Sequence, residues 1–192
     1  MRDVLQSISP YYYYLIAEGL KPMEIRKNRP KDPNWSGVVQ AYCTKDKKSF
    51  ARIPKEYQEK YRSHMGKIGF RYQCDLIEKI RTPYKYAEHP KIQQDICSKS
   101  RLSSQELMKY IGLGGTGYGW HISDIVIYDK PKELIEFKRP CDGNCQECRY
   151  ALWQTYTFIS ESKIVGCTQK VSVPQSWCYV EELNNGSKKS ID

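Results

Sequence analysis

The chain has 192 residues, of which 31 are Lys or Arg, 22 are Asp or Glu and 40% are hydrophobic. A chain of this length forms about one domain and buries roughly 70% of its unfolded surface, so disulfides or metal are not needed for folding. A mean hydropathy of -0.71, with no run of about 18 apolar residues, argues against a membrane-spanning helix. The first residues lack the apolar stretch of a secretory signal, so we expect a cytoplasmic protein without a membrane partner.

The excess positive charge belongs to the first half of the chain. Residues 1–100 hold 20 basic and 11 acidic side chains, whereas residues 101–192 hold 11 of each. A one-sided basic surface favours nucleic-acid binding, because each Lys or Arg placed on a phosphate releases a condensed counterion. The 16 tyrosines, against 4 phenylalanines, add rings that can stack on a base. An ordinary solvated basic surface with structural tyrosines is the alternative that composition leaves open.

The first predicted elements are a short strand and a short helix. Residues alternate between two faces over Val4–Ser9, which predicts a strand that ends before Pro10. Ser9 and Pro10 are typical of a helix start, and Gly19 is typical of a helix end. We therefore expect a helix through Glu18, followed at once by the next element.

A second strand is predicted where apolar and charged residues alternate over Met23–Lys27, with Glu24 and Arg26 on one face. Further strands are expected at residues 38–44, 68–80, 121–128 and 177–183, and helical segments at residues 103–111 and 131–137. Residues 55–62 are expected to form either a short charged helix or a long loop. The glycine-rich run at residues 112–117 lacks a phosphate-loop lysine and the dinucleotide-binding spacing, so it predicts a loop and no cofactor. Short strands interrupted by helices, without a repeated strand–helix–strand rhythm, predict an α+β fold built on a mixed or antiparallel β-barrel.

Three of the eight cysteines form a C-x3-C-x2-C run in a segment that can fold back on itself. A structural zinc ion takes four ligands in a tetrahedron, and a following hairpin could supply the fourth. Zinc is therefore one prediction, with the ligands Cys141, Cys145, Cys148 and Cys167. Cys178 and His121 are the alternatives for the fourth ligand, and free thiols without metal are the alternative to the whole site.

The segment Ser7–Pro10, followed by Gly19, Lys21, Glu24 and Arg26, resembles the start of an ASCH domain, a family within the PUA-like barrels. The family pattern is a glycine, a lysine two positions later, a glutamate three after that and an arginine two further on. Later stretches, at residues 120–134 and 174–183, are similar to prophage-associated bacterial members. The resemblance implies one ASCH/PUA-like domain over residues 1–183, insertions near residues 45–65, 81–119 and 138–170, and a flexible tail at residues 184–192.

The resemblance also implies a cleft beside the first helix and second strand that holds RNA or a nucleotide-like ligand. Lys21 offers a mobile point charge, Arg26 a planar fork for phosphate or a carbonyl, and Glu24 an acceptor. The residues expected to bind nucleic acid are Lys21, Glu24, Arg26, Lys27, Arg29, Trp120 and Trp177. Two alternatives stay open: Glu24 and Arg26 could pair with each other at the barrel mouth, and the tryptophans could lie in the core.

Two further functions are compatible with the resemblance. Some family members resemble amidohydrolases of acetylated cytidine, with a lysine, a threonine and a glutamate in the cleft, and others are described as ribonucleases. A hydrolase would use Lys21 and Glu24 as catalytic residues, but Pro22 and Met23 follow the lysine where a threonine would be needed. The third hypothesis is a phage-associated interaction scaffold that contacts partners through residues 141–167. Whether the protein is an enzyme is therefore left open by the sequence.

Overall fold

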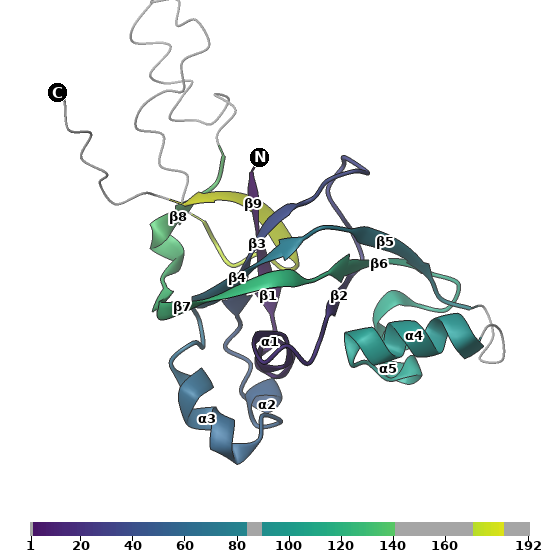
Figure 1. The fold of residues 1–192 in the computed structure, drawn as a ribbon, viewed down its shortest axis with the longest axis horizontal. Helices are drawn as coiled ribbons and strands as arrows, with labels where there is room; N and C mark the ends of the chain where they lie inside the picture. Colours follow the sequence, from purple (N-terminus) through teal and green to yellow (C-terminus); the bar gives the residue numbers. More distant parts are fainter. Residues whose placement is uncertain (1, 84–89, 141–170, 183–192) are drawn as a thin grey trace, which may run out of the picture.

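The computed structural model describes residues 2–83, 90–140 and 171–182, and its strands form a six-stranded and a three-stranded sheet (Figure 1). The strands are β1 (Asp3–Ile8), β2 (Met23–Arg26), β3 (Gly37–Cys43), β4 (Ile68–Cys74), β5 (Ile77–Arg81), β6 (Thr116–His121), β7 (Ser123–Lys132), β8 (Phe137–Lys138) and β9 (Trp177–Glu182). The helices are α1 (Pro10–Ala17), α2 (Lys47–Phe50), α3 (Lys55–Arg62), α4 (Pro90–Ser100) and α5 (Ser104–Ile111), with a 3-10 turn, η1, at Leu134–Glu136. None of the described helices is long and apolar enough to cross a membrane.

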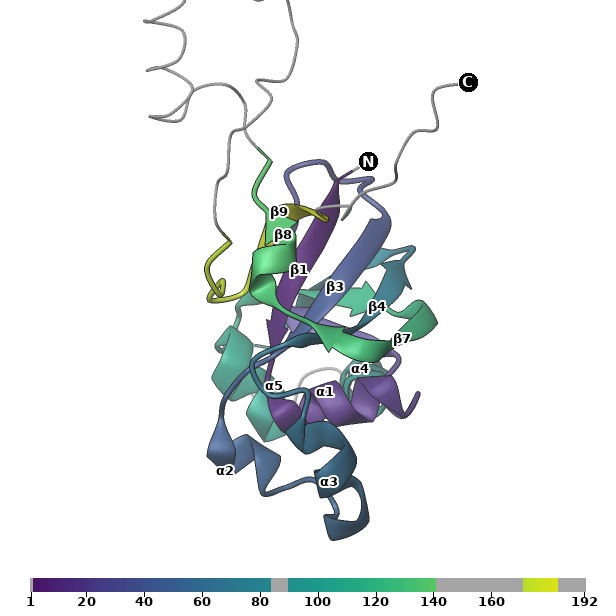
Figure 2. The same cartoon turned by 90° about the vertical axis from the view of Figure 1, so that its left-hand side faces the viewer.

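The larger sheet has the strand order β7-β4-β3-β1-β9-β8, and the smaller one has the order β2-β6-β5. β1 pairs in parallel with β3 and antiparallel with β9, and the remaining pairs are antiparallel. The sheets curl into a half-barrel, with α1 beside β1 and β2 and with α2 and α3 beneath α1 (Figures 1 and 2). The predicted α+β class, a mixed and curled β-sheet with short helices, is confirmed.

The main core fills the concave side of the half-barrel. Alternate residues of β1, β3 and β4 point into it, and residues of α1 and the indole of Trp120 on β6 complete it. Trp120 is fully buried against Trp35 and Trp177, at ring-centroid distances of 5.4 and 5.9 Å. Cys43 and Cys74 are also buried here, as expected for small apolar side chains within strands.

The segment from α1 to β2 places the Gly-Lys-Glu-Arg motif. Ser9 is the N-cap of α1, although its side chain makes no capping hydrogen bond, and Pro10 occupies the first turn. Gly19 has a φ of +70°, and the backbone N–H groups of Leu20 and Lys21 both donate to the carbonyl of Leu15, at 2.8 and 3.0 Å. A left-handed residue of this kind ends a helix by satisfying its last carbonyls, so the chain turns sharply and delivers Lys21 beside the start of β2.

All four residues of β2 are buried. Met23 and Ile25 pack with Ile96 of α4 and Leu107 of α5 in a second core cluster. The alternation in this strand therefore separates an apolar face covered by helices from a charged face, rather than a buried face from solvent.

Several predicted elements differ from the observed ones. The strand predicted at residues 68–80 is two strands in different sheets, because the chain leaves the larger sheet after Cys74 and exposes 54% of Leu76 at the crossing. The strand predicted at residues 121–128 is likewise the end of β6 and the start of β7. The short helix α2, whose N-terminus is capped by Asp46, was not predicted.

The segments predicted as insertions contain much of the helical structure. Residues 45–65 contain α2 and α3, and residues 81–119 contain α4, α5 and the first half of β6. Helix α4 was not predicted from the sequence. The segment 138–170 lies largely outside the described residues, and the predicted tail at residues 184–192 lies wholly outside them.

Candidate functional site

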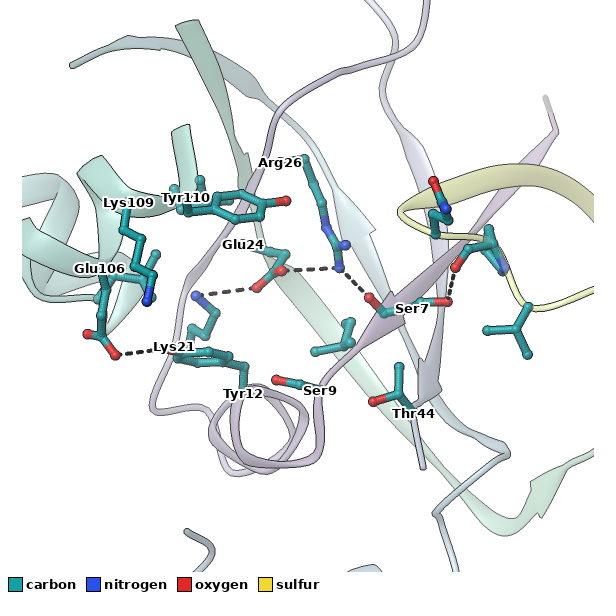
Figure 3. A pocket seen from close by; sticks show the side chains of 16 residues that line it. Ser7, Ser9, Tyr12, Lys21, Glu24, Arg26, Thr44, Glu106, Lys109 and Tyr110 are labelled. Carbon is teal, nitrogen blue, oxygen red and sulfur yellow. Dashed lines mark hydrogen bonds and ion pairs between the residues drawn. The ribbon is translucent and has the colours of Figure 1, made fainter. Parts of the chain in front are cut away.

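A pocket of about 620 Å³ opens between the end of β1, strand β2, helices α1 and α5, and the loop before β9 (Figure 3). Its size falls within the range of about 300–1,000 Å³ that is usual for small-molecule sites. Its lining consists of Ser7, Ile8, Ser9, Tyr12, Lys21, Glu24, Ile25, Arg26, Thr44, Leu102, Glu106, Lys109, Tyr110, Val173, Pro174 and Gln175. The three charged residues of the predicted motif therefore share one pocket.

Glu24 lies between the two cations of the motif. Its carboxylate oxygens are 3.3 Å from Lys21 Nζ and 3.1 Å from Arg26 Nη2. The side chains of Lys21, Glu24 and Arg26 are only 1%, 11% and 6% exposed, so water screens these ion pairs weakly. The ion pair between Glu24 and Arg26, which was the alternative to a binding role, is therefore present. Both residues also line the pocket.

Backbone carbonyls hold the two cations in place. Lys21 Nζ donates to the carbonyl of Ser100, at the end of α4, and Arg26 Nη2 donates to the carbonyl of Ser7 at 2.8 Å. Ser7 in turn donates its hydroxyl to the carbonyl of Pro174 at 2.7 Å. The mobile point charge expected at Lys21 is therefore a fixed, buried ammonium group.

Burial lowers the pKa of Lys21 below its ordinary range, while Glu24 opposes this shift and Arg26 adds to it. On the arginine, Nε is buried and has no hydrogen-bond partner among the described residues. An unsatisfied buried donor is costly unless water or a ligand oxygen meets it. Arg26 Nε is thus a buried donor that the described residues leave unsatisfied.

Two tyrosines line the pocket on either side of the Lys21–Glu24 pair, Tyr12 from α1 and Tyr110 from α5 (Figure 3). Lys21 Nζ lies 5.1 Å from the ring centre of Tyr12, and Lys27 Nζ lies 5.3 Å from that of Tyr110. Burial raises the pKa of both tyrosines, so their hydroxyls stay protonated at neutral pH. The pocket therefore combines ring faces, hydroxyl groups and paired charges.

Helix α5 adds Glu106 and Lys109 to the pocket. Its N-terminus is a capping box in which Ser103 and Glu106 satisfy each other's backbone N–H groups. The backbone N–H of Ser103 is the main cause of the lowered pKa of Glu106. With Lys21, Glu24 and Arg26, the lining holds three cations and two carboxylates.

The other residues predicted to bind nucleic acid lie outside the lining of this pocket. Lys27 is exposed beside Tyr110, and Arg29 lies 5.5 Å from the ring centre of Tyr118 while donating to the carbonyl of Pro33. Trp120 is fully buried in the core, so its ring offers no face to a base. Trp177 is half-buried and donates its indole N–H to Asn28 at 2.9 Å.

Five polar or aromatic residues of the pocket were not singled out in the sequence. Glu106, Lys109 and Tyr110 are spaced three and four residues apart on α5, a pattern that places them near one face of a helix. Nothing local links that face to β2, which is about eighty residues earlier in the chain. Tyr12 is one of four consecutive tyrosines in α1, and Thr44 reaches the pocket from the end of β3.

Neither of the two histidines within the described residues lines the pocket. His64 is buried and lies 2.9 Å from the Tyr13 hydroxyl, and His121 pairs with Glu78 at 3.2 Å. Across residues 2–83, 90–140 and 171–182, no group of three His, Cys, Asp or Glu side chains could hold a metal ion. The predicted ligands Cys141, Cys145, Cys148 and Cys167 lie outside the described residues.

Comparison with known proteins gives matches in structure but not in sequence. No protein-family model matches the chain, and no curated protein matches it. A variant of ASCH from Zymomonas mobilis, with one tyrosine changed to phenylalanine, has a TM-score of 0.50 and 12% identity over 94% of this chain and 91% of that chain. The unaltered ASCH from the same organism gives 0.49 and 14%, over 94% and 88% of the two chains. The chain therefore has the fold of an ASCH domain, as the resemblance of its N-terminal motif implied.

Proposed function

We propose that this chain is an ASCH-domain protein that binds RNA or nucleotides and holds one nucleotide unit in the pocket. One observation carries the proposal: Lys21, Glu24 and Arg26, the charged residues of the motif, are buried together in a nucleotide-sized pocket lined by two tyrosine rings. The fold of the Zymomonas ASCH structure supports this assignment.

Each part of the pocket suits a part of a nucleotide. The rings of Tyr12 and Tyr110 offer stacking surfaces, and stacking of one base on an aromatic side chain contributes about 1–3 kcal/mol. The Arg26 guanidinium lines the pocket and suits a carbonyl or phosphate oxygen, and Glu24 can accept from a base amino group. Lys109 is exposed at the pocket and suits a phosphate as a point charge.

Titration calorimetry with the four ribonucleoside monophosphates tests this function. Replacing Tyr110 by leucine keeps an apolar side chain on α5 but removes the ring, and we expect a loss of about 1–3 kcal/mol in binding free energy. Lys109→Gln should weaken a nucleotide more than the corresponding nucleoside, because the nucleoside has no phosphate. Lys99→Gln on the neighbouring helix α4 is the matched control and should bind as the unaltered protein does. Equal affinity for all three variants would place the ligand elsewhere.

Hydrolysis of RNA or a modified nucleoside is the second candidate, and two observations favour it. The buried Lys21 has a lowered pKa. The motif around Lys21 contains no threonine, but the fold brings Thr44 from the end of β3 into the same pocket. A lysine with a lowered pKa is more often neutral, as an amine base or nucleophile must be. Lys21→Ala and Glu24→Gln should then each abolish turnover of acetylated cytidine or a labelled RNA while the protein stays folded. Turnover retained by both variants would reject these catalytic roles.

A further inference from the structure

More than half of the chain's net charge is concentrated in the segment around α2 and α3. Residues 45–67 contain eight Lys and Arg and three Asp and Glu, a net charge of +5 against +9 for the whole chain. Seven of these eight basic residues are exposed and the eighth, Lys67, is half-buried. This concentration was not visible from the division of the chain into halves, and none of the residues in it belongs to the pocket.

Some of these basic side chains are already neutralised by partners. Lys60 pairs with Glu18 at 2.7 Å, Lys67 with Glu133 at 2.9 Å, and Arg62 with Glu59 at 3.7 Å. Within the described residues, Lys45, Lys47 and Lys48 form no ion pair, and the one acidic residue between them, Asp46, accepts the backbone N–H groups that begin α2. Lys55, at the start of α3, forms no ion pair among the described residues either, so three of these four unneutralised lysines lie at the start of α2.

The start of α2 follows the pocket directly along the chain, and Arg52 after α2 contacts it. Thr44 lines the pocket and Lys45 is the next residue. Arg52, just after α2, lies 4.0 Å from the ring centre of Tyr11 and 5.5 Å from that of the pocket residue Tyr12. It also approaches Glu106, on the other side of the pocket, at 4.0 Å.

The N-terminus of α1 and α2 are fixed to each other. The backbone N–H of Tyr11 donates to the hydroxyl of Ser49 on α2 at 3.0 Å. Lys48 and Arg52 are four residues apart, with a helical hydrogen bond from Ala51 to Lys47 between them, so they lie near one face. Arg52 therefore lies over the rings of Tyr11 and Tyr12 at one side of the pocket. Three of the lysines that form no ion pair in the described part of the chain lie on α2 and in the residues just before it. We call the lysine group and Arg52 the α2 surface: Lys45, Lys47, Lys48 and Arg52.

We propose that the α2 surface binds the phosphate backbone of a single-stranded RNA whose neighbouring nucleotide occupies the pocket. The inference rests on the proposed function and extends it from a single nucleotide to a chain. A row of point charges without base-reading groups attracts phosphates irrespective of sequence. Stacked tyrosine and arginine groups suit the exposed bases of a single strand, and a duplex hides those faces.

The test is fluorescence anisotropy with a labelled oligouridine of about 12 nucleotides, over a range of salt concentrations. The α2 variant combines Lys45→Gln, Lys47→Gln and Lys48→Gln. We expect it to bind the oligonucleotide at least about tenfold more weakly at low salt, with a salt slope shallower by up to about 2, since each single-strand phosphate contact contributes about 0.7. Its affinity for uridine monophosphate should be unchanged, because the pocket is intact.

A control variant removes the same charge elsewhere, with Arg71→Gln, Lys79→Gln and Lys130→Gln at exposed positions of β4, β5 and β7. It should bind the oligonucleotide with the unaltered salt slope.

If both triple variants weaken binding equally, only net charge matters and the α2 surface is rejected. If the α2 variant binds normally while Tyr110→Leu does not, the pocket function stands and the surface is rejected. If the unaltered protein binds the monophosphate but gains no affinity from the longer chain, the surface is again rejected, whereas failure to bind either ligand rejects the proposed function itself. Equal competition by poly-glutamate of the same charge would indicate an acidic protein partner and overturn the assignment to RNA.

Discussion

Replacing Glu24 by glutamine is the most revealing change to the buried charges of the pocket. Glutamine keeps the size of the side chain and can still accept a hydrogen bond, but it removes the one negative charge between Lys21 Nζ at 3.3 Å and Arg26 Nη2 at 3.1 Å. Neither cation has more than 6% of its side chain exposed, so water cannot replace the lost carboxylate. Two buried positive charges then face each other without compensation.

Breaking a buried ion pair by removing one partner costs about 3–5 kcal/mol. For a chain of this size, 1 kcal/mol corresponds to roughly 2–4 °C in Tm. We therefore expect Glu24→Gln to lower Tm by about 6–20 °C and to move the urea midpoint down without changing the slope of the transition.

The matched control is Asp95→Asn, which removes the carboxylate from an exposed ion pair with Lys99 at 2.8 Å. Exposed pairs contribute about 0–1 kcal/mol, so this variant should unfold almost as the unaltered protein does. A Glu24→Gln variant that also lost less than about 1 kcal/mol would show that water solvates the pocket charges as it does surface pairs. The argument from their burial would then be refuted.

Three other predictions concern the core and the cysteine segment. Burial lowers the pKa of His64 below the unfolded value of about 6.5. The unfolded chain therefore binds more protons than the folded protein between these two pKa values. The free energy of unfolding should fall as the pH drops from 6.5 through the folded pKa. Urea unfolding at pH 7.5 and pH 5 should show a smaller difference for His64→Gln, and an unchanged difference would exclude His64 as its source. A Cβ at Gly69 would overlap His64 Nδ1 and the Tyr13 hydroxyl, so Gly69→Ala should cost about 1–3 kcal/mol of unfolding free energy, and a neutral result in thermal denaturation would contradict this packing. The zinc site in residues 141–167 stays a prediction: protein purified without added zinc should contain one zinc per chain by metal analysis, and a molar ratio near zero would reject it.

The charged part of the pocket could be predicted because it is local in the sequence. Gly19 ends α1 and reverses the chain, and two-residue spacing places Glu24 and Arg26 on the same face of β2. Lys21 joins them because the backbone N–H of that residue closes the end of the helix. Each of these steps depends only on neighbouring residues. Strand β2 and the grouping of Lys21, Glu24 and Arg26 could therefore both be predicted from the sequence.

The rest of the pocket depends on contacts between distant parts of the chain. Tyr110 and Lys109 reach it because α5 packs through Leu107 on the apolar face of β2, and no local pattern reports that docking. The same limitation explains the incorrect expectation for Trp120. Trp120 was expected among the binding residues, with burial in the core as the alternative, and its indole packs in the main core although its backbone pairs with Glu24. The break after Cys74 was missed because the apolar alternation of β4 continues in sequence past the point where the chain changes sheets.

Photocrosslinking tests the central claim most directly, namely that the pocket beside α1 and β2 receives a nucleotide of RNA. The full chain would be irradiated with an oligouridine of about 12 nucleotides containing 4-thiouridine, and the crosslinked peptides would be mapped by mass spectrometry. We predict crosslinks to peptides that contain Tyr12 or Tyr110, and their loss when excess uridine monophosphate occupies the pocket. Crosslinks confined to β7 and β8, or crosslinks to the tyrosine peptides that persist with the monophosphate in excess, would contradict the claim.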